Sequence, residues 1–465
     1  MRAEPISDLR LSVIGLGKLG SPMAAVFAAK GFDVVGVDLN RSYVDALNAG
    51  RAPVDEPQLQ QYIDAGRTRL RATDSFDEAV GAADVTFIIV PTPSGPDHFF
   101  TYGYVVDAVE RIGRALADSD RDHLVVITST VMPGSTAGVI RQALERSSGR
   151  TVGRDVGLCY SPEFIALGSV IHDLLHPDMV LIGECDARYG DRLEQIYRHV
   201  TGPAPAVHRM NFVNAELCKI AVNTFVTTKI SYANMMAELC DRLDGADVDV
   251  ISRALGADTR IGAKYLRGGV AYGGPCFPRD NKAFAALGRS LGVRCDIAEA
   301  TDAINDRQVQ RLFGAVVASV ERGARVAVLG LSYKLHTSVV EASQGVTLAR
   351  LLVDEGYRVV IADPLAAESA KSLLGDGVEL ASSLEQAVSS SDIAVITTPW
   401  PDIRQIPVNA FVRAARRFPV VDPWGLLKDT NIVRVAKVIA LGRGGSSAPA
   451  AAGVGALAQS GSRLG

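Results

Sequence analysis

Apolar and polar positions at the start of this chain follow a repeating strand and helix pattern. The apolar run at residues 10–15 ends in glycine, a helical stretch follows at about residues 21–30, and a second apolar run at residues 31–38 ends in Asp38. Two more apolar runs end in turns rich in Thr, Pro and Gly, at residues 83–93 and 123–134. Short apolar runs that alternate with helical patterns are typical of a doubly wound α/β sheet, whose strand ends line a ligand crevice.

The turn after the first run carries a glycine fingerprint. Gly15, Gly17 and Gly20 have Gly-x-Gly-x-x-Gly spacing, with Leu19 inside the motif, and Asp38 ends the next strand. Strand, glycine turn, helix, strand and acid occur in the order of a dinucleotide-binding unit. The glycines let the backbone approach a pyrophosphate at a helix N-terminus, and the acid accepts hydrogen bonds from ribose hydroxyls and repels a 2′-phosphate. We therefore expect NAD as the cofactor.

The same pattern returns in the last third of the chain. Residues 325–334 again run into glycine, a helix is expected at about residues 344–355, residues 356–364 contain Asp363, and residues 391–401 repeat the earlier strand and turn. We predict a second doubly wound α/β domain there. Because it lacks the full glycine fingerprint, we expect it to hold a nucleotide-like ligand with fewer phosphates instead of a second dinucleotide.

The stretch between the two copies is rich in helical patterns. Residues 211–243 place apolar side chains at helical spacing without proline or glycine, which predicts one long helix. Its apolar faces exceed what one partner needs, so a dimer interface is plausible. The expected fold class is α/β, with two Rossmann-like doubly wound domains joined by a long central helix and a helical dimerisation region.

Length and composition narrow the function. A chain of 465 residues predicts two or three domains. A net charge of −4 argues against a nucleic-acid partner, and no run of about 18 apolar residues predicts a membrane span. Residues 1–10 do not resemble a signal peptide. The six cysteines form no C-x-x-C pair or zinc-like cluster, so we expect no metal and free thiols in a reducing cytoplasm.

Cys276 lies in the motif with the most unusual composition, Gly-Gly-Pro-Cys-Phe-Pro-Arg-Asp at residues 273–280. A thiolate can attack an aldehyde, and the resulting thiohemiacetal still carries a hydrogen that can leave as a second hydride. Asp280 could then act as base for the water that releases an acid. A buried structural cysteine in a Gly/Pro turn is the alternative, and local chemistry leaves the two interpretations even.

Two further candidate sites have plausible structural interpretations. Lys219 and Asn223 are four residues apart and share a helix face among apolar residues, so a functional lysine and a solvated one are about equally expected. Glu163 follows an apolar strand in the sequence Tyr-Ser-Pro-Glu-Phe. Pattern alone slightly favours a helix cap over a functional carboxylate there.

Together these motifs resemble the nucleotide-sugar 6-dehydrogenases, a family that includes UDP-glucose, UDP-N-acetylmannosamine and GDP-mannose dehydrogenases; the resemblance is nearest to UDP-glucose 6-dehydrogenase. It covers roughly residues 8–435. The motifs that carry it, in the family order, are GLGKLG, VPTP at 90–93, STVMPG at 129–134, SPEF at 161–164, the Lys219/Asn223 helix, GGPCFPRD and LGLSYK. The resemblance implies that the C6 alcohol of a nucleotide sugar, most simply UDP-glucose, is oxidised to a carboxylate with two NAD through a cysteine adduct.

The resemblance also implies residue roles. Cys276 is the nucleophile, Lys219 stabilises an oxyanion, Asn223 hydrogen-bonds the same oxygen or a water, and Asp280 and Thr130 position or activate water. The expected cofactor-binding residues are Gly15, Gly17, Leu19, Gly20, Asp38, Thr92 and Thr130. The expected substrate-binding residues are Glu163, Phe164, Lys219, Asn223, Arg260 (supplied across a homodimer), Tyr265, Tyr272, Gly273 and Lys334. The implied domains are an NAD-binding domain (1–210), a central dimerisation domain with the cysteine (211–321), a nucleotide-sugar-binding domain (322–441) and a disordered tail (442–465).

Three departures from the family pattern surround the expected substrate. Leu167 stands where many UDP-glucose enzymes have a second loop glutamate, so that role falls to Glu163, to water or to another group, or the substrate differs. Glu341 stands where the family has an arginine, and residues 422–425 read Asp-Pro-Trp-Gly in place of Asp-Gly-Arg-Asn. Two alternatives to the double oxidation stay open. One is a single oxidation that yields one NADH, as in related 3-hydroxyacid dehydrogenases with the same N-terminal fold. The other is a non-catalytic paralogue that binds a sugar nucleotide, which Leu167 and Glu341 support.

Overall fold

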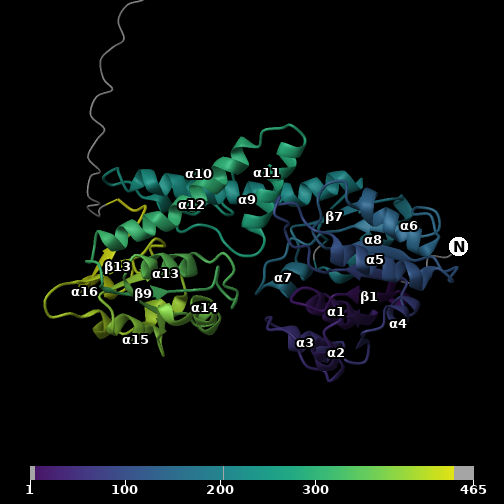
Figure 1. Cartoon of the computed structure of the whole chain (residues 1–465), viewed down its shortest axis with the longest axis horizontal. Helices are drawn as coiled ribbons and strands as arrows, with labels where there is room; N and C mark the ends of the chain where they lie inside the picture. The colour runs from purple at the N-terminus through teal and green to yellow at the C-terminus, as the bar shows by residue number, and fades with distance from the viewer. Residues whose placement is uncertain (1–5, 203, 445–465) are drawn as a thin grey trace, which may run out of the picture. The chain divides into compact units, whose positions relative to one another are not determined.

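A computed structural model describes residues 6–202 and 204–444 of the chain (Figure 1). It divides into two compact units, the first made of Met1–Thr227 with Pro275–Ala300 and the second of Thr228–Gly274 with Thr301–Gly465. The mixed α/β class with two doubly wound domains, expected from the sequence, is confirmed. Each unit is described by itself below.

The first unit is built on an eight-stranded sheet in the order β3-β2-β1-β4-β5-β6-β7-β8. Neighbouring strands are parallel except β6 and β7, which pair antiparallel. The strands are β1 (Arg10–Ile14), β2 (Asp33–Val37), β3 (Leu70–Thr73), β4 (Val85–Ile88), β5 (Leu124–Ile127), β6 (Gly157–Tyr160), β7 (Met179–Glu184) and β8 (Ala206–Met210). The central order 3-2-1-4-5 is that of a dinucleotide-binding sheet.

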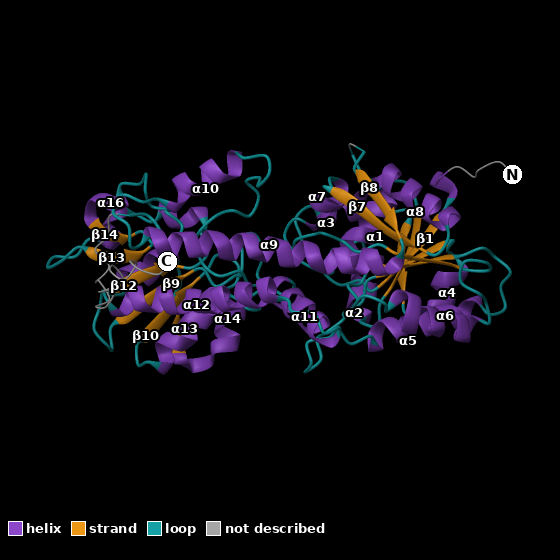
Figure 2. Cartoon of the chain, turned by 90° about the horizontal axis from the view of Figure 1, so that it is seen from above, coloured by secondary structure: helices purple, strands orange, loops and turns teal. Residues whose placement is uncertain are grey.

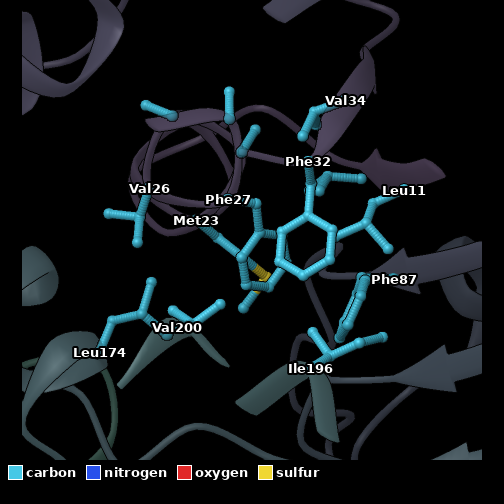
Figure 3. Packing of buried hydrophobic residues seen from close by; sticks show 14 of the residues in the cluster. Leu11, Met23, Val26, Phe27, Phe32, Val34, Phe87, Leu174, Ile196 and Val200 are labelled. Atoms are coloured by element: carbon cyan, nitrogen blue, oxygen red, sulfur yellow. The ribbon is translucent and has the colours of Figure 1, made fainter. Parts of the chain in front are cut away.

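Helices cover this sheet. They are α1 (Gly20–Ala29), α2 (Arg41–Asn48), α3 (Leu59–Ala65), α4 (Phe76–Gly81), α5 (Gly103–Leu116), α6 (Arg141–Ser148), α7 (Val170–Leu175) and α8 (Ala187–Val200), with short 3-10 and π turns at Ile6–Asp8 and Thr136–Ile140. In Figure 3, Phe27 of α1 lies among side chains from the sheet and from α8. Its ring centroid is 5.1 Å from that of Phe87 and 6.2 Å from that of Phe32. This packing fixes the C-terminal half of α1 against the sheet.

The long helix expected at residues 211–243 is α9 (Phe212–Cys240), 29 residues without a break (Figure 2). Its first part, up to Thr227, belongs to the first unit and the remainder to the second. The other helices of this region are α10 (Val248–Ala257), α11 (Phe277–Ser290) and α12 (Asp296–Val317). Because α11 belongs to the first unit, Cys276 and Asp280 lie in the same compact unit as the fingerprint glycines.

The second unit carries a fully parallel six-stranded sheet in the order β11-β10-β9-β12-β13-β14. Its strands are β9 (Arg325–Leu329), β10 (Arg358–Ala362), β11 (Val378–Leu380), β12 (Ile393–Ile396), β13 (Phe418–Val421) and β14 (Ala436–Ile439). Its helices are α13 (Gln344–Asp354), α14 (Ala367–Leu374), α15 (Leu384–Ser389) and α16 (Ile432–Val435), with 3-10 turns at Gly375–Gly377, Pro401–Gln405 and Val408–Phe411. This order repeats that of β3-β2-β1-β4-β5-β6 in the first sheet, as the repeated sequence pattern predicts.

Of the expected tail at residues 442–465, the structure describes residues 442–444, and residues 445–465 lie outside the described part. Arg443 is buried, and its guanidinium donates to both carboxylate oxygens of Asp249 at 2.7 and 2.8 Å. None of the helices described in the structure combines the length and the apolar character that a bilayer crossing requires.

Candidate active site

The three fingerprint glycines have different surroundings. Gly15 has φ +97°, and a Cβ there would lie 2.5 Å from the carbonyl oxygen of Ile89. A Cβ on Gly20 would lie 1.7 Å from the carbonyl oxygen of Gly15. Gly17, in contrast, has no atom within 4 Å of the position that a Cβ would take. Gly15 and Gly20 are thus required by close packing of strand and helix, whereas Gly17 leaves space in front of α1.

This space fits NAD. Leu19 is the N-cap residue of α1, and its side chain cannot accept a hydrogen bond from the helix N-terminus, which favours an anion there. Asp38 follows β2 and accepts the N–H groups of Leu16 and Asn40, both at 2.7 Å. A carboxylate has further lone pairs for ribose hydroxyls. Thr92 donates its hydroxyl to the carbonyl of Thr130 at 2.7 Å, which ties together the turns after β4 and β5.

Cys276 is the N-cap residue of α11, and the residue is exposed. Pro278 lies in the first turn of this helix, where its missing N–H costs nothing. The peptide dipoles at a helix N-terminus stabilise negative charge, such as that of a thiolate or of an oxygen on a thiol adduct. The thiol is therefore accessible and placed where an anionic intermediate is favoured.

Lys219 and Asn223 lie on the part of α9 that belongs to the first unit, and both are buried. Asn223 donates its amide Nδ2 to Asp280 Oδ2 at 2.7 Å. Burial lowers the pKa of the Lys219 ammonium, and the charges of Asp280, Cys276 and Glu163 oppose this shift. Asn223 of one stretch thus binds Asp280 of the other, and Lys219 interacts electrostatically with Asp280 and Cys276.

Glu163 continues this cluster. Its backbone carbonyl accepts a hydrogen bond from Lys219 Nζ, and Lys219 Nζ lies 4.6 Å from the ring centroid of Phe164. Tyr197 donates its hydroxyl to Glu163 Oε1 at 3.4 Å and accepts one from Ser161 at 3.1 Å. Burial raises the pKa of Glu163 to about 7, although Lys219 and Tyr197 act in the opposite direction. A carboxyl group that titrates near neutrality can exchange a proton during a reaction.

Arg279 is a site residue whose role no sequence pattern indicates. It pairs with Asp280, with Nε and one terminal nitrogen each 3.0 Å from Oδ1. It also donates to the carbonyl of Thr92 at 3.4 Å, and its guanidinium carbon lies 4.6 Å from the centroid of the Phe100 ring. Asp280, which is 1% exposed, is therefore held on one oxygen by Asn223 and on the other by Arg279.

Glu216 is a second residue that sequence reasoning missed. It is fully buried, and its two oxygens accept the N–H groups of Gly134 and Thr136 at 2.6 and 2.7 Å. Burial raises its pKa. Because Glu216 lies one helical turn before Lys219 on α9, it fixes the turn that contains Thr130 against the helix that carries Lys219. Its spacing from Lys219 was the available signal.

The loop that contains Leu167 is held by hydrogen bonds to a residue far away in the sequence. Glu56 accepts the N–H groups of Gly168 and Val170 at 2.9 and 2.8 Å, and Asp173 accepts that of Ala166 at 3.0 Å. Leu167 therefore stands in a backbone loop that two carboxylates fix on either side. Leu167 has no carboxylate to replace the family's second glutamate. Glu163 is the titratable residue of the loop at residues 161–169.

The remaining expected substrate residues belong to the second unit: Arg260, Tyr265, Tyr272, Gly273 and Lys334. The Arg260 side chain is exposed and pairs with Asp258 at 2.6 Å. Tyr265 is 52% exposed with φ +63°. Tyr272 is buried and donates its hydroxyl to Asp302 at 2.7 Å. Gly273 lies against Ala342, and Lys334 lies in the connection between β9 and α13.

The chain is similar to known proteins over most of its length. Three domain models of the UDP-glucose/GDP-mannose dehydrogenase family match the chain: the NAD-binding domain at residues 9–201, the central domain at 213–307 and the UDP-binding domain at 327–429. The chain is 36% identical over 399 residues to the UDP-glucose 6-dehydrogenase of Haloferax volcanii, covering 85% of this chain and 92% of that protein. It is 35% identical over 360 residues to the GDP-mannose 6-dehydrogenase of Pseudomonas putida, covering 76% and 81%.

A solved structure is also similar over nearly the whole chain. The UDP-glucose dehydrogenase of Pyrobaculum islandicum superposes with a TM-score of 0.85 at 35% identity, covering 96% of this chain and 100% of that one. The match therefore includes both doubly wound sheets and the helices between them.

Proposed function

Because this chain belongs to the UDP-glucose/GDP-mannose dehydrogenase family, we propose that it oxidises the C6 alcohol of UDP-glucose to the uronic acid through an adduct on Cys276. The chain is an NAD-dependent oxidoreductase of nucleotide sugars. The observation that carries the proposal is the cluster in the first unit, where Asn223 binds Asp280 and the buried Lys219 interacts electrostatically with Asp280 and Cys276. The Haloferax and Pyrobaculum relatives, both named for UDP-glucose, support this choice of sugar.

The roles in the first oxidation follow from charge and burial. NAD, when bound, accepts one hydride in each of the two oxidations. Lys219 is buried and carries the charge that stabilises the oxyanion on the C6 oxygen as the alcohol loses its proton to an ordered water. Asn223 donates to Asp280, which holds the amide in one orientation towards the reacting oxygen or an ordered water. Arg279 neutralises Asp280, so the carboxylate stays fixed while the proton moves.

The second oxidation uses the thiol. The Cys276 sulfur adds to the aldehyde carbon, and the oxygen takes up a proton to give a thiohemiacetal. The hydrogen that remains on C6 then leaves as a hydride and the hydroxyl proton passes to water, which gives a thioester. Water then attacks the thioester carbonyl, the carbon–sulfur bond breaks, and the acid and the thiol are released. We assign proton removal from this water to Glu163, whose pKa of about 7 suits a base near neutral pH. Thr130 and Asp280 position the water.

The domain roles remain predictions that the family matches support. We assign NAD binding to residues 1–210, with Gly15, Gly17, Gly20 and Asp38 at its centre. We assign dimerisation and the thiol to residues 211–321, and nucleotide-sugar binding to residues 322–441. In the latter two domains the proposed substrate contacts are Arg260, Tyr265, Tyr272, Gly273 and Lys334. We also place the enzyme in the cytoplasm, where NAD and a free thiol are available together.

We further propose a homodimer. Helix α9 exposes large apolar side chains along its length, and Phe225, the most exposed of them, is 67% accessible; the others are Val213, Leu217, Tyr232 and Leu239. An exposed apolar row of this kind is typical of an interface, and Arg260 would then reach the partner's substrate. A Phe225→Glu variant should sediment as a monomer at micromolar concentration, and an unchanged dimer would contradict this interface.

The substrate assignment is tested with the purified chain, NAD and a panel of UDP-glucose, UDP-N-acetylmannosamine and GDP-mannose, scored by product mass. We expect the uronic acid from UDP-glucose, and acid formation from GDP-mannose alone would contradict the assignment. A Cys276→Ser variant should lose acid formation by about 10³-fold or more. Cys295→Ser is the matched control, since Cys295 lies outside the cluster, and it should keep its activity. Full acid production by Cys276→Ser would overturn the adduct mechanism.

A further inference from the structure

The carboxylate of Glu163 is held by a pair of hydroxyl groups that come from two elements of the first unit. Tyr197 of α8 donates its hydroxyl to Glu163 Oε1 at 3.4 Å. Ser161, just after β6, donates its own hydroxyl to the Tyr197 oxygen at 3.1 Å. A tyrosine hydroxyl has a single proton. Because the Tyr197 oxygen accepts the proton of Ser161, its own proton is directed to the Glu163 carboxylate.

Both hydroxyl groups are fixed by their surroundings. Ser161 is 1% exposed and Tyr197 is 3% exposed. The N–H of Ser161 donates to the carbonyl of Ile127 at 2.9 Å, which continues the pairing of β5 with β6. Ile196 and Val200, on the same helix as Tyr197, pack in the core shown in Figure 3. The Tyr197 ring therefore has little freedom, and its hydroxyl keeps one position.

Glu163 differs from these two residues because it is partly exposed and can meet a water. Its backbone is held from another direction, since Lys219 of α9 donates its ammonium to the Glu163 carbonyl. A carboxylate has about four lone-pair sites, so the hydrogen bond at Oε1 leaves sites for a water. Helix α9 thus fixes the backbone of Glu163, and helix α8 fixes the direction of its carboxylate.

Few charged groups act on this carboxyl group. Partial burial raises the pKa of Glu163 to about 7, and Lys219 and Tyr197 act in the opposite direction. The other two carboxylates at this loop, Asp173 and Glu56, accept backbone N–H groups. Burial raises the pKa of the Tyr197 hydroxyl well above its usual range, so it keeps its proton at every working pH. Tyr197 is therefore a permanent donor to Glu163.

We propose that Tyr197 is the positioning residue that orients the Glu163 carboxylate for proton removal from the hydrolytic water, with Ser161 directing the Tyr197 hydroxyl. The proposal rests on the proposed function, in which Glu163 is the base. A hydrogen bond to the charged form of a carboxyl group favours that form. Tyr197 thus keeps Glu163 ionised at a lower pH than burial alone would allow, and it acts through Glu163 without exchanging a proton itself.

The test replaces Tyr197 by phenylalanine, which keeps the ring and removes the hydroxyl. Acid release is followed in a single turnover with enzyme in excess and NAD saturating, on both sides of neutral pH, by quenching and product mass. In Tyr197→Phe we expect the acidic limb to move to higher pH by about 0.5–1 unit, the worth of one ordinary hydrogen bond. At about pH 6 the rate should fall about three- to tenfold. KM for the sugar nucleotide should stay unaltered.

Tyr189→Phe is the matched control. Tyr189 also lies on α8, is 0% exposed and donates its hydroxyl to Asp122 at 2.7 Å. This variant loses a buried hydrogen bond of the same helix and should keep the wild-type limb. A merely structural role of Tyr197 would lower the rate by the same factor at every pH. A Tyr197→Phe limb at the wild-type pH would therefore overturn the proposal.

A second change keeps the test decisive if Tyr197→Phe does not fold. Incorporation of 3-fluorotyrosine in place of Tyr197 keeps the shape of the ring and makes the hydroxyl a stronger acid and a stronger donor. The limb should then move to lower pH, and an unmoved limb would overturn the proposal.

Glu163→Gln, measured in parallel, separates this proposal from the proposed function. A limb that persists in Glu163→Gln contradicts the base assignment, and the positioning role fails with it. A limb that is lost in Glu163→Gln but unshifted in Tyr197→Phe contradicts the positioning role alone. The experiment uses whichever sugar nucleotide of the panel yields acid, so a failure of the UDP-glucose assignment leaves these outcomes unchanged.

Discussion

The two doubly wound halves share a strand order and an aspartate after the second strand of the order, Asp38 in the first half and Asp363 in the second. The space beside this aspartate is open in the first half and filled in the second. In the first half Asp38 accepts two backbone N–H groups, from Leu16 and Asn40. In the second half Asp363 accepts the equivalent N–H groups, from Leu331 and Leu365. It then accepts more, from the N–H and hydroxyl of Ser332, the N–H of Ala366 and the indole Nε1 of Trp400.

The glycine positions differ in the same sense. Gly17 leaves open space in the first half, whereas the second half has the buried Ser332 at the matching place after its first glycine. Gly345 is the counterpart of Gly20, since a Cβ there would lie 2.2 Å from the carbonyl oxygen of Gly330. In the second half these two glycines are separated by residues 331–344, which connect β9 to α13. Asp38, the proposed ribose partner, thus keeps room for further hydrogen bonds, whereas Asp363 acts as an internal structural anchor.

The largest difference between the halves should appear in stability on replacing the acids. Asp363→Asn leaves several buried donors facing an amide, so we expect the free energy of unfolding to fall by about 3–5 kcal/mol. Asp38→Asn is the matched change in a partly exposed site and should cost about 1 kcal/mol. Urea denaturation followed by circular dichroism measures both. Equal losses would show that Asp363 is not an anchor.

Gly17 and Ser332 occupy matching positions in the two halves, and replacing each by the other residue should change cofactor binding only at Gly17. Gly17→Ser fills the space in front of α1, so we expect KM for NAD to rise about 10- to 100-fold, equivalent to about 1.4–2.7 kcal/mol. Ser332→Gly makes the reverse change in the second half and should leave KM for NAD unaltered. Initial rates at saturating sugar nucleotide decide this. A shift of KM for NAD in Ser332→Gly would break the comparison.

The first half also contains Glu163, the carboxyl group that we propose as the base. Because burial raises the pKa of Glu163 to about 7, its carboxylate is lost as pH falls below that value. We expect acid release to slow about tenfold per pH unit below 7 and to level off above it. Glu163→Gln should remove this limb and give a low, flat profile. Since the folded pKa exceeds the ordinary one, Glu163 also lowers stability as pH rises from about 4.5 to 7. An unchanged profile in the variant would exclude Glu163 as the base.

The smallest effect is expected at Trp400, which is 4% exposed. Trp400→Phe removes one hydrogen bond, of 3.0 Å, to Asp363 and keeps the ring. We expect a loss of about 1 kcal/mol in the free energy of unfolding and no change in KM for NAD. Thermal melting together with the NAD titration checks both. A weaker NAD affinity would mean that the second half takes part in cofactor binding.

The sequence was sufficient for features that depend on local spacing. The fingerprint glycines, Asp38 and the repeated pattern predict both sheets, and the residues of α9 predict an unbroken helix. The prediction that the second half does not hold a dinucleotide in the same way is consistent with Asp363 and Ser332, which occupy the matching space. Lys219 and Asn223 were recognised as one face because they are one helical turn apart.

Long-range partners could not be predicted in this way. The contacts of Arg279 with Phe100, of Glu216 with the turn after β5 and of Tyr197 with Glu163 join residues from separate elements, and no local pattern marks such pairs. The close contact of Gly345 with Gly330 could not be recognised in the sequence because residues 331–344 separate the two glycines. The residues that contact the two glycines before Cys276 also required coordinates, because spacing along the sequence does not identify a contact partner.

The most direct test of the account is the number of NADH molecules formed for each UDP-glucose consumed, read by absorbance with NAD in excess and UDP-glucose limiting. Oxidation through the Cys276 adduct predicts two NADH per sugar nucleotide, with a product whose mass is that of the uronic acid. One NADH per sugar nucleotide, with an aldehyde or ketone as the product, would contradict it.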